Sequence, residues 1–260
     1  MARMKMLFTL SVAGLVAGAS AMAAEQNDHR AYELRIYHAA LGKLDDLNKR
    51  FRDHTTAIFE RHGMQNIGYW VPLDNTNNVL IYIIAHQSRE AAAKSWKAFG
   101  SDPEWRSVAK ASEANGKLVI KVESYYMQPT DYSPAIKASK SGEPRVFELR
   151  EYTASTDNLP ALDARFRDHT LTLFTKHGME NVAYWHLMPD QKDAGRKLIY
   201  LLAHKSKEAG EASFASFRKD PDWVKAKEAS EQKAGGSLTE GGMAGVKSTY
   251  MKPMDYSPMQ

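Results

Sequence analysis

The sequence contains no cysteine among its 260 residues. Disulfide bonds, thiolate nucleophiles, cysteine-held iron–sulfur clusters and zinc ribbons are therefore excluded. A haem, if one is bound, must be held non-covalently, because the CxxCH attachment motif is impossible. The fold must depend on burial of apolar side chains, for which the length and the 43% hydrophobic content are sufficient.

Common catalytic motifs are also missing. Beyond residue 23 the sequence has no HExxH, GxSxG, P-loop or GxGxxG pattern. His54 and His62 lie on one predicted helix, about 12 Å apart along its axis, so they cannot share a metal ion. We therefore predict no metal site and no standard hydrolytic, phosphoryl-transfer or dinucleotide chemistry.

The net charge is small. Without residues 1–23, which contain Arg3 and Lys5 and no acidic residue, 33 basic residues face 31 acidic ones, a net charge of +2. This near balance predicts no nucleic-acid partner.

The longest apolar run is at the N-terminus. Arg3 and Lys5 precede about 13 mainly apolar residues from Leu7, and small residues end at Ala21-Met22-Ala23. A membrane-spanning helix needs about 20 apolar residues, so an uncleaved anchor is disfavoured. We expect residues 1–23 to be a secretory signal peptide, and the mature protein to be periplasmic or secreted, with no stable membrane span.

What the sequence does have is an internal repeat. "YELRIYHA" at 32–39 returns as "FELREYTA" at 147–154, and "RFRDHTTAIFERHGMQNIGYW" at 50–70 returns as "RFRDHTLTLFTKHGMENVAYW" at 165–185. Further on, "DYSP" closes both copies. The predicted organisation is unit 1 at 25–134, a linker at 135–144 and unit 2 at 145–260.

Each unit shows the order βαββαβ of a ferredoxin-like unit. In unit 1 the patterns predict strands at 32–38, 67–71, 79–85 and 118–127, a helix ending near His62-Gly63, and a second helical region that begins after Ser88 and continues beyond Asp102-Pro103. Helices cover one face of such a sheet, so the other face needs a partner. We predict an α+β fold in which the two units stack sheet to sheet as an intramolecular, self-contained barrel, and a monomeric chain.

Strand alternation suggests a polar interior. If Leu34 and Ile36 point to the helices, their neighbours point between the sheets, and a mixed polar and aromatic interior suits a small, partly apolar ligand. A Glu–Arg ladder with ordinary interface aromatics is the alternative. The candidate ligand-binding residues are Glu33, Arg35, Tyr37, Tyr82, His86, Glu148, Arg150, Tyr152, Tyr200 and His204.

The histidines of "RFRDHT" are interpreted as structural. At 100° per residue, His54 lies in the middle of the apolar stripe formed by Leu47, Phe51 and Ile58, and His169 lies likewise in unit 2. A buried histidine of this kind more often braces a fold than performs catalysis. Catalytic residues remain unidentified, and His54, His169, His86 or His204 stay open as axial ligands of a haem.

The combination of "FELREYT", "HGM" followed by "YW", the segment from Trp96 to Trp105 with its repeat from Phe214 to Trp223, and the closing "DYSP" resembles the NIPSNAP family over both copies. The resemblance implies a dimeric α/β-barrel, here formed within one chain. The wider barrel superfamily includes cofactor-free monooxygenases and haem-handling proteins, whereas NIPSNAP proteins have no settled reaction.

Three functions stay open at this stage. The first is a periplasmic protein that binds a small, partly apolar ligand in the barrel, with cofactor-free oxygenase-like chemistry as an extension. The second is a non-covalent haem protein. The third is a non-enzymatic interaction module that uses Trp105, Trp223 and the "DYSP" tails as a docking surface. The sequence names neither a ligand nor a cofactor.

Overall fold

The computed structural model describes residues 28–137 and 145–260, so the predicted signal peptide and most of the predicted linker lie outside the described residues. Unit 1 consists of β1 (Ala31–Ala39), α1 (Leu44–Arg50), a π-helix η1 (Phe51–Thr55), α2 (Thr56–Arg61), β2 (Gln65–Pro72), β3 (Val79–His86), α3 (Arg89–Ser101), α4 (Pro103–Ser112) and β4 (Val119–Pro129).

Unit 2 repeats this order. It consists of β5 (Val146–Thr153), α5 (Leu159–Arg165), a π-helix η2 (Phe166–Thr170), α6 (Leu171–Lys176), β6 (Glu180–Leu187), β7 (Lys197–His204), α7 (Lys207–Phe217), α8 (Pro221–Ala234), a 3₁₀ helix η3 (Gly242–Gly245) and β8 (Lys247–Pro253). The predicted strands and helices of unit 1 are thus present, with bounds extended by a few residues.

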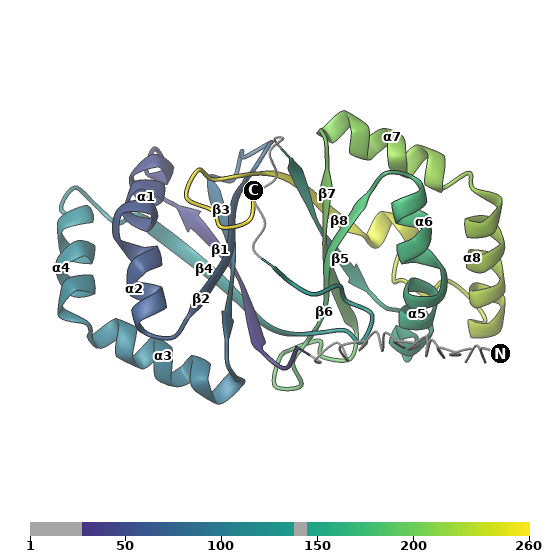
Figure 1. Ribbon diagram of the computed structural model, residues 1–260, viewed down its shortest axis with the longest axis horizontal. Coiled ribbons are helices and arrows are strands. Elements are labelled where there is room, and N and C mark those ends of the chain that lie inside the picture. Colours follow the sequence, from purple (N-terminus) through teal and green to yellow (C-terminus); the bar gives the residue numbers. More distant parts are fainter. Residues whose placement is uncertain (1–27, 138–144) are drawn as a thin grey trace, which may run out of the picture.

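The strands close into one barrel in the order β1-β3-β2-β8-β5-β7-β6-β4. Two short antiparallel seams join the units: β2 pairs with β8 from Trp70 to Pro72, and β4 pairs with β6 from Met127 to Pro129. The helices of unit 1 flank one side of the barrel and those of unit 2 flank the other (Figure 1). The predicted fold of two stacked ferredoxin-like units in one chain is confirmed.

The barrel interior is apolar, which contradicts the predicted orientation of the strands. Leu34 and Leu149 lie in one buried cluster that contains side chains from the strands of both units. Aromatic pairs from both units also lie there, with the ring centroids of Tyr32 and Trp185 5.7 Å apart. The lumen of an eight-stranded barrel is about as wide as the side chains that fill it, so apolar side chains pack it.

The polar residues therefore face the helices. Glu33 of β1 accepts a hydrogen bond from the indole of Trp96 on α3, and Tyr37 packs edge-on against Phe51 of η1. The alternation of the strand was predicted correctly, but the two faces were exchanged. The reason is that the helices of each unit present aromatic and polar partners, whereas the sheet of the other unit presents mainly apolar side chains.

The "DYSP" segments clasp the opposite unit. Asp255, after β8, accepts two hydrogen bonds from Arg52 of η1, at 2.8 and 2.6 Å. Asp131, after β4, accepts the equivalent pair from Arg167, at 2.8 and 2.7 Å. In Figure 1 the chain after β8 ends beside the strands of unit 1. These tails are therefore used within the chain, and the docking surface predicted from them is wrong.

The two tryptophans assigned to that surface are also packed internally. Trp105 is half-buried with its ring centroid 4.4 Å from that of Phe99, and Trp223 is 9% exposed with its ring 4.4 Å from that of Phe217. In each unit the Asp-Pro pair before the tryptophan caps a helix, since Asp102 and Asp220 accept backbone hydrogen bonds at the N-termini of α4 and α8.

The prediction that His54 and His169 are buried is wrong. Both histidines are exposed, whereas Thr55 and Thr170 are buried. The cause is the π-helical turn, which holds an extra residue and rotates the following side chains relative to an α-helix. The hydroxyl groups of Thr55 and Thr170 donate to the carbonyl groups five residues earlier, at 3.1 and 3.0 Å.

The histidines that end these helices lie as predicted. His62 and His177 are the C-cap residues of α2 and α6, and each is followed by a glycine with positive φ. The imidazole of His62 also contacts the Asp102 carboxylate at 2.8 Å, and His177 contacts Asp220 at 2.7 Å.

We predict that unit 1 expressed alone, as residues 25–134, forms a dimer or aggregates. Its apolar sheet face and the seam ends of β2 and β4 are covered by unit 2 in the full chain. Analytical ultracentrifugation tests this, with the full chain as the reference. A stable monomer of the fragment would contradict the dependence of one unit on the other.

We also predict that His54→Ala changes the free energy of unfolding by less than about 0.5 kcal/mol, as expected for an exposed side chain. Thr55→Val should cost roughly 1–2 kcal/mol, because it removes a buried hydroxyl donor and leaves a carbonyl unpaired. Urea unfolding of both variants gives the comparison. A larger cost for His54→Ala than for Thr55→Val would show that the histidine supports the fold.

Candidate functional site

In unit 1 the predicted site residues form a closed polar network between the sheet and α3. The carboxylate of Glu33, which is fully buried, accepts hydrogen bonds from Arg35, Ser124 at 2.6 Å, Trp96 at 2.7 Å and His86 at 3.1 Å. Burial alone would raise the pKa of Glu33, but the His86 hydrogen bond, the charge of Arg35 and the remaining donors outweigh it and lower that pKa to about 2.

Unit 2 repeats the network with two differences: the tryptophan donor is replaced, and Arg150 Nε donates to the Tyr200 hydroxyl at 2.8 Å, whereas Arg35 Nε in unit 1 is unpaired among the described residues. The buried carboxylate of Glu148 accepts from Arg150, from Ser248 and from His204, the last at 2.9 Å. Burial opposes ionisation, yet these hydrogen bonds and the charge of Arg150 still lower the pKa of Glu148. The position of Trp96 is taken by Phe214, which has no N–H group to donate.

The predicted ligand-binding residues thus lie in two separate groups rather than around one chamber. In both groups the carboxylate accepts at least three hydrogen bonds and is closed to solvent, so the network braces the sheet against the helices. Of the candidates, Tyr152 also lines the pocket described next. The unit 1 group contains Glu33, Arg35, Tyr37, Tyr82 and His86, and the unit 2 group contains Glu148, Arg150, Tyr152, Tyr200 and His204.

A pocket of about 470 Å³ lies on the helix side of unit 2. We call it the unit 2 pocket. Its walls come from the strand β5, the helices α5 to α8, η2 and the segment that precedes β8. Its lining residues are Tyr152, Arg165, Phe166, Thr170, Phe174, Phe214, Phe217, Arg218, Trp223, Val224, Lys227, Glu228, Glu231, Ser237, Thr239, Gly242, Met243 and Val246.

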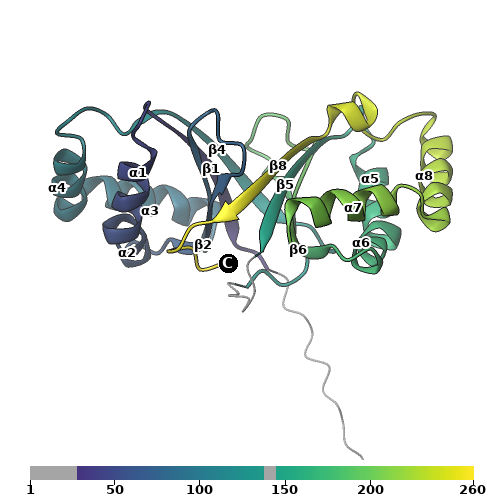
Figure 2. The same ribbon diagram turned by 90° about the horizontal axis from the view of Figure 1, so that it is seen from above.

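The segment between α8 and β8 opens this pocket. In unit 1, Leu118 accepts a backbone hydrogen bond from Ala40 and β4 begins at the next residue. In unit 2 the carbonyl of Leu238 likewise accepts a backbone hydrogen bond from Ser155, but β8 begins only at Lys247. Thr239 still bridges to Ala154 and the N–H of Glu240 still donates to the Thr153 carbonyl, but residues 241–246 leave the sheet and include the yellow 3₁₀ turn that is visible in Figure 2.

Glycine is required in this detour. A Cβ atom on Gly245 would lie 1.9 Å from the backbone oxygen of Glu240, so no larger residue fits there without a backbone shift. Gly241 has φ +67°, in the left-handed region that glycine favours. The glycines of "GGMAG" at 241–245 are therefore the signal that could have predicted the pocket, together with the change from tryptophan at 96 to phenylalanine at 214.

One buried cation borders the unit 2 pocket. Arg165, at the end of α5, is 6% exposed, and its guanidinium carbon lies 5.2 Å from the centre of the Trp223 ring. Burial lowers the pKa of Arg165 below its usual value, against the raising effect of Glu231. The sequence did not predict a role for this residue, because the same arginine begins "RFRDHT" in both units.

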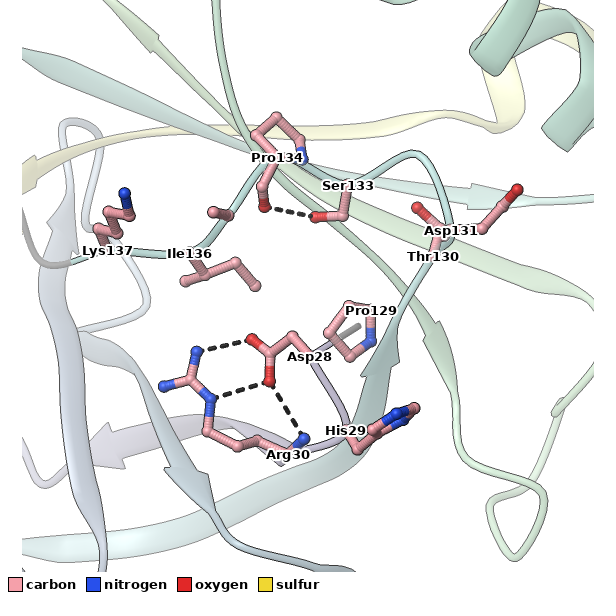
Figure 3. A pocket seen from close by; sticks show the side chains of 11 residues that line it. Asp28, His29, Arg30, Pro129, Thr130, Asp131, Ser133, Pro134, Ile136 and Lys137 are labelled. Atoms are coloured by element: carbon pink, nitrogen blue, oxygen red, sulfur yellow. Dashed lines mark hydrogen bonds and ion pairs between the residues drawn. The ribbon is translucent and has the colours of Figure 1, made fainter. Parts of the chain in front are cut away.

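A second pocket, of about 620 Å³, lies at one end of the barrel between the residues before β1 and those after β4 (Figure 3). Its Asp28 carboxylate is already bound by the guanidinium of Arg30, at 2.9 and 2.6 Å, and by the Tyr32 hydroxyl at 2.5 Å. Asp28 and Lys137 are each next to residues outside the described ranges, so this pocket is not assigned as a site.

The described ranges, 28–137 and 145–260, contain no group of three or more histidine or carboxylate side chains placed to hold a metal ion. Within the same ranges, no helix is long and apolar enough to cross a membrane.

A family model described as NIPSNAP matches residues 32–134 and again residues 147–258. No curated protein matches the chain.

Several solved structures are similar. An anthrone oxidase-like protein has a TM-score of 0.55 at 14% identity, with 90% of this chain and 95% of that chain covered. A protein from Lactobacillus acidophilus, assigned provisionally as a monooxygenase, has a TM-score of 0.52 at 11% identity, with 86% and 94% covered. A NIPSNAP family protein of unknown function from Agrobacterium tumefaciens is 25% identical, with 42% and 96% covered and a TM-score of 0.37. At these identities the first two likenesses establish the fold alone.

The Glu33 network yields a pH prediction. A carboxyl group whose pKa is lower in the folded state stabilises the fold fully above its unfolded value of about 4.5 and loses that contribution as the pH falls towards 2. Glu33→Gln should therefore cost about 3 kcal/mol at neutral pH and flatten the pH dependence of unfolding in this window. Denaturant unfolding between pH 7 and pH 2 measures both effects.

The control is Asp45→Asn, which neutralises an exposed carboxylate. It should leave the neutral-pH stability and the steep acid window of the wild type nearly unchanged. If Glu33→Gln behaved like this control, the carboxylate would not be the brace described above.

Proposed function

The chain belongs to the NIPSNAP family, and from this premise we propose that it is a binding protein for a small, partly apolar ligand, with the unit 2 pocket as the binding site. We further propose a periplasmic or secreted location, on the strength of the signal-like residues 1–23.

The observation that carries the proposal is the lining of the pocket. Six aromatic side chains line a volume that lies in the range of small-molecule sites, and charged side chains, among them Arg165, Arg218 and Glu231, share the lining with them. These aromatic residues are Tyr152, Phe166, Phe174, Phe214, Phe217 and Trp223. The proposed binding site therefore lies between one sheet and its helices. It does not lie between the two sheets, as the sequence suggested, because side chains fill that space.

The haem alternative is less favoured by the same geometry. The lining of the unit 2 pocket contains no histidine. His86 and His204 are buried and bonded to glutamates, and His54 and His169 lie on the exposed side of the π-helices. A small organic ligand without an axial histidine fits this arrangement better.

Oxygenase-like activity on such a ligand is a second candidate function. It is favoured by the shared fold with the anthrone oxidase-like protein. Oxidation of an anthrone to an anthraquinone consumes one O₂ and releases one water, and the ligand itself supplies the electrons. Oxygen uptake with anthrone as the probe tests this, and uptake that is unaffected when the pocket is blocked would contradict it.

We predict that Val246→Trp weakens ligand binding by at least about tenfold, because the indole would occupy the pocket from the segment before β8. The probe is N-phenyl-1-naphthylamine, a neutral dye whose fluorescence rises in apolar sites. Titration of the wild type should give one dye per chain.

The matched control is Val122→Trp, which changes the equivalent residue of unit 1 on β4, 44% exposed. Its dye affinity should equal that of the wild type. Absence of dye binding to the wild type, or an equal loss in both variants, would contradict the assignment of the unit 2 pocket.

A further inference from the structure

The unit 2 pocket has a charged end and an apolar body. Arg165 borders it, while Phe166, Phe174, Phe217 and Trp223 line its interior. We propose that the ligand is a planar aromatic anion whose carboxylate, or an equivalent acidic group, binds the guanidinium of Arg165. This inference rests on the proposed function and specifies the ligand class.

The hydrogen bonds of Arg165 are incomplete within the part of the chain that the structure describes. Its Nη1 atom reaches Ser230 Oγ at 3.4 Å and Glu231 Oε1 at 3.5 Å, both long contacts. Its Nε atom is buried and has no hydrogen-bond partner there; the equivalent Arg50 shares this feature but does not line the aromatic pocket. A buried guanidinium with free donors is a binding group for a carboxylate, which it can engage through two parallel hydrogen bonds.

The nearest acidic group does not neutralise this cation well. Glu231 also forms an ion pair with Lys227, at 2.9 Å between Nζ and Oε2, so its charge is shared. In unit 1 the equivalent Arg50 lies closer to its glutamate, at 3.2 Å from Glu113 Oε1. Since charges interact more strongly in a desolvated site, an anionic ligand would gain more beside Arg165 than in water.

The aromatic body favours a flat ligand. The ring centroids of Phe217 and Trp223 lie 4.4 Å apart, and those of Phe174 and Phe217 lie 4.9 Å apart, so the wall is a continuous layer of rings. Aromatic rings pack well against such a layer in stacked or edge-on geometry. One face of Trp223 is also occupied by the Arg165 guanidinium, which places the charged end next to the ring layer.

The test compares two ligands of nearly equal shape, naphthalene-2-carboxylate and naphthalene-2-carboxamide, by isothermal titration. The wild type should bind the carboxylate at least about tenfold more tightly than the amide. Arg165→Met should abolish this preference and leave the affinity for the amide within about threefold. Arg50→Met, the matched control in unit 1, should keep the preference.

Equal affinity of the wild type for both ligands would overturn the inference, and this outcome needs no variant that might fold poorly. A preference that survives in Arg165→Met would also overturn it, because the charge would then be recognised elsewhere. Either result leaves the proposed binding function intact if the neutral dye still binds. Failure of the proposed function itself would appear as loss of dye binding in the wild type.

Discussion

Closure of the barrel is the constraint on which the remaining structure depends. Each unit has an apolar sheet face that only the other unit covers, and the seams between β2 and β8 and between β4 and β6 are short. The ion pairs of Arg52 with Asp255 and of Arg167 with Asp131 lie next to these seams and join one unit to the other. The strands, the barrel interior and the tails therefore all hold the units together. The layer between each sheet and its own helices has no such role, so it can differ between the units.

The repeat and the period of the strands were sufficient to predict this architecture. They could not predict which face of a strand is interior, because an alternation of Glu33 with Leu34 is compatible with both orientations. The deciding fact is tertiary: the helices supply Trp96 and its neighbours as partners for the charged face, and two stacked apolar faces need no polar partners. A buried carboxylate is tolerated only where donors surround it, and those donors came from residues distant in sequence.

The helix that carries "RFRDHT" shows a second limit of sequence patterns. The series Phe51, His54, Ile58 fits an α-helical stripe, and the series Phe51, Thr55, Ile58 fits a helix with one wide turn. Hydrophobicity does not separate the two. The available signal is the threonine at 55 and at 170, whose hydroxyl reaches the carbonyl that a wide turn exposes. The motif recurs because its second arginine joins the units and its threonine supports the turn, and the exposed histidine takes no part in either.

The two units share the features that close the barrel. They differ in regions that take no part in closing it. Residues 241–246 leave the sheet before β8 and line the unit 2 pocket with Gly242, Met243 and Val246, while the barrel remains closed. The same arginine then has two environments: Arg50 lies 3.2 Å from Glu113, while Arg165 lies 3.5 Å from Glu231 and lines an aromatic pocket. In a symmetric dimer of single units, such a change would appear twice. In a tandem chain it appears once, so the layer between sheet and helices can differ between the two units.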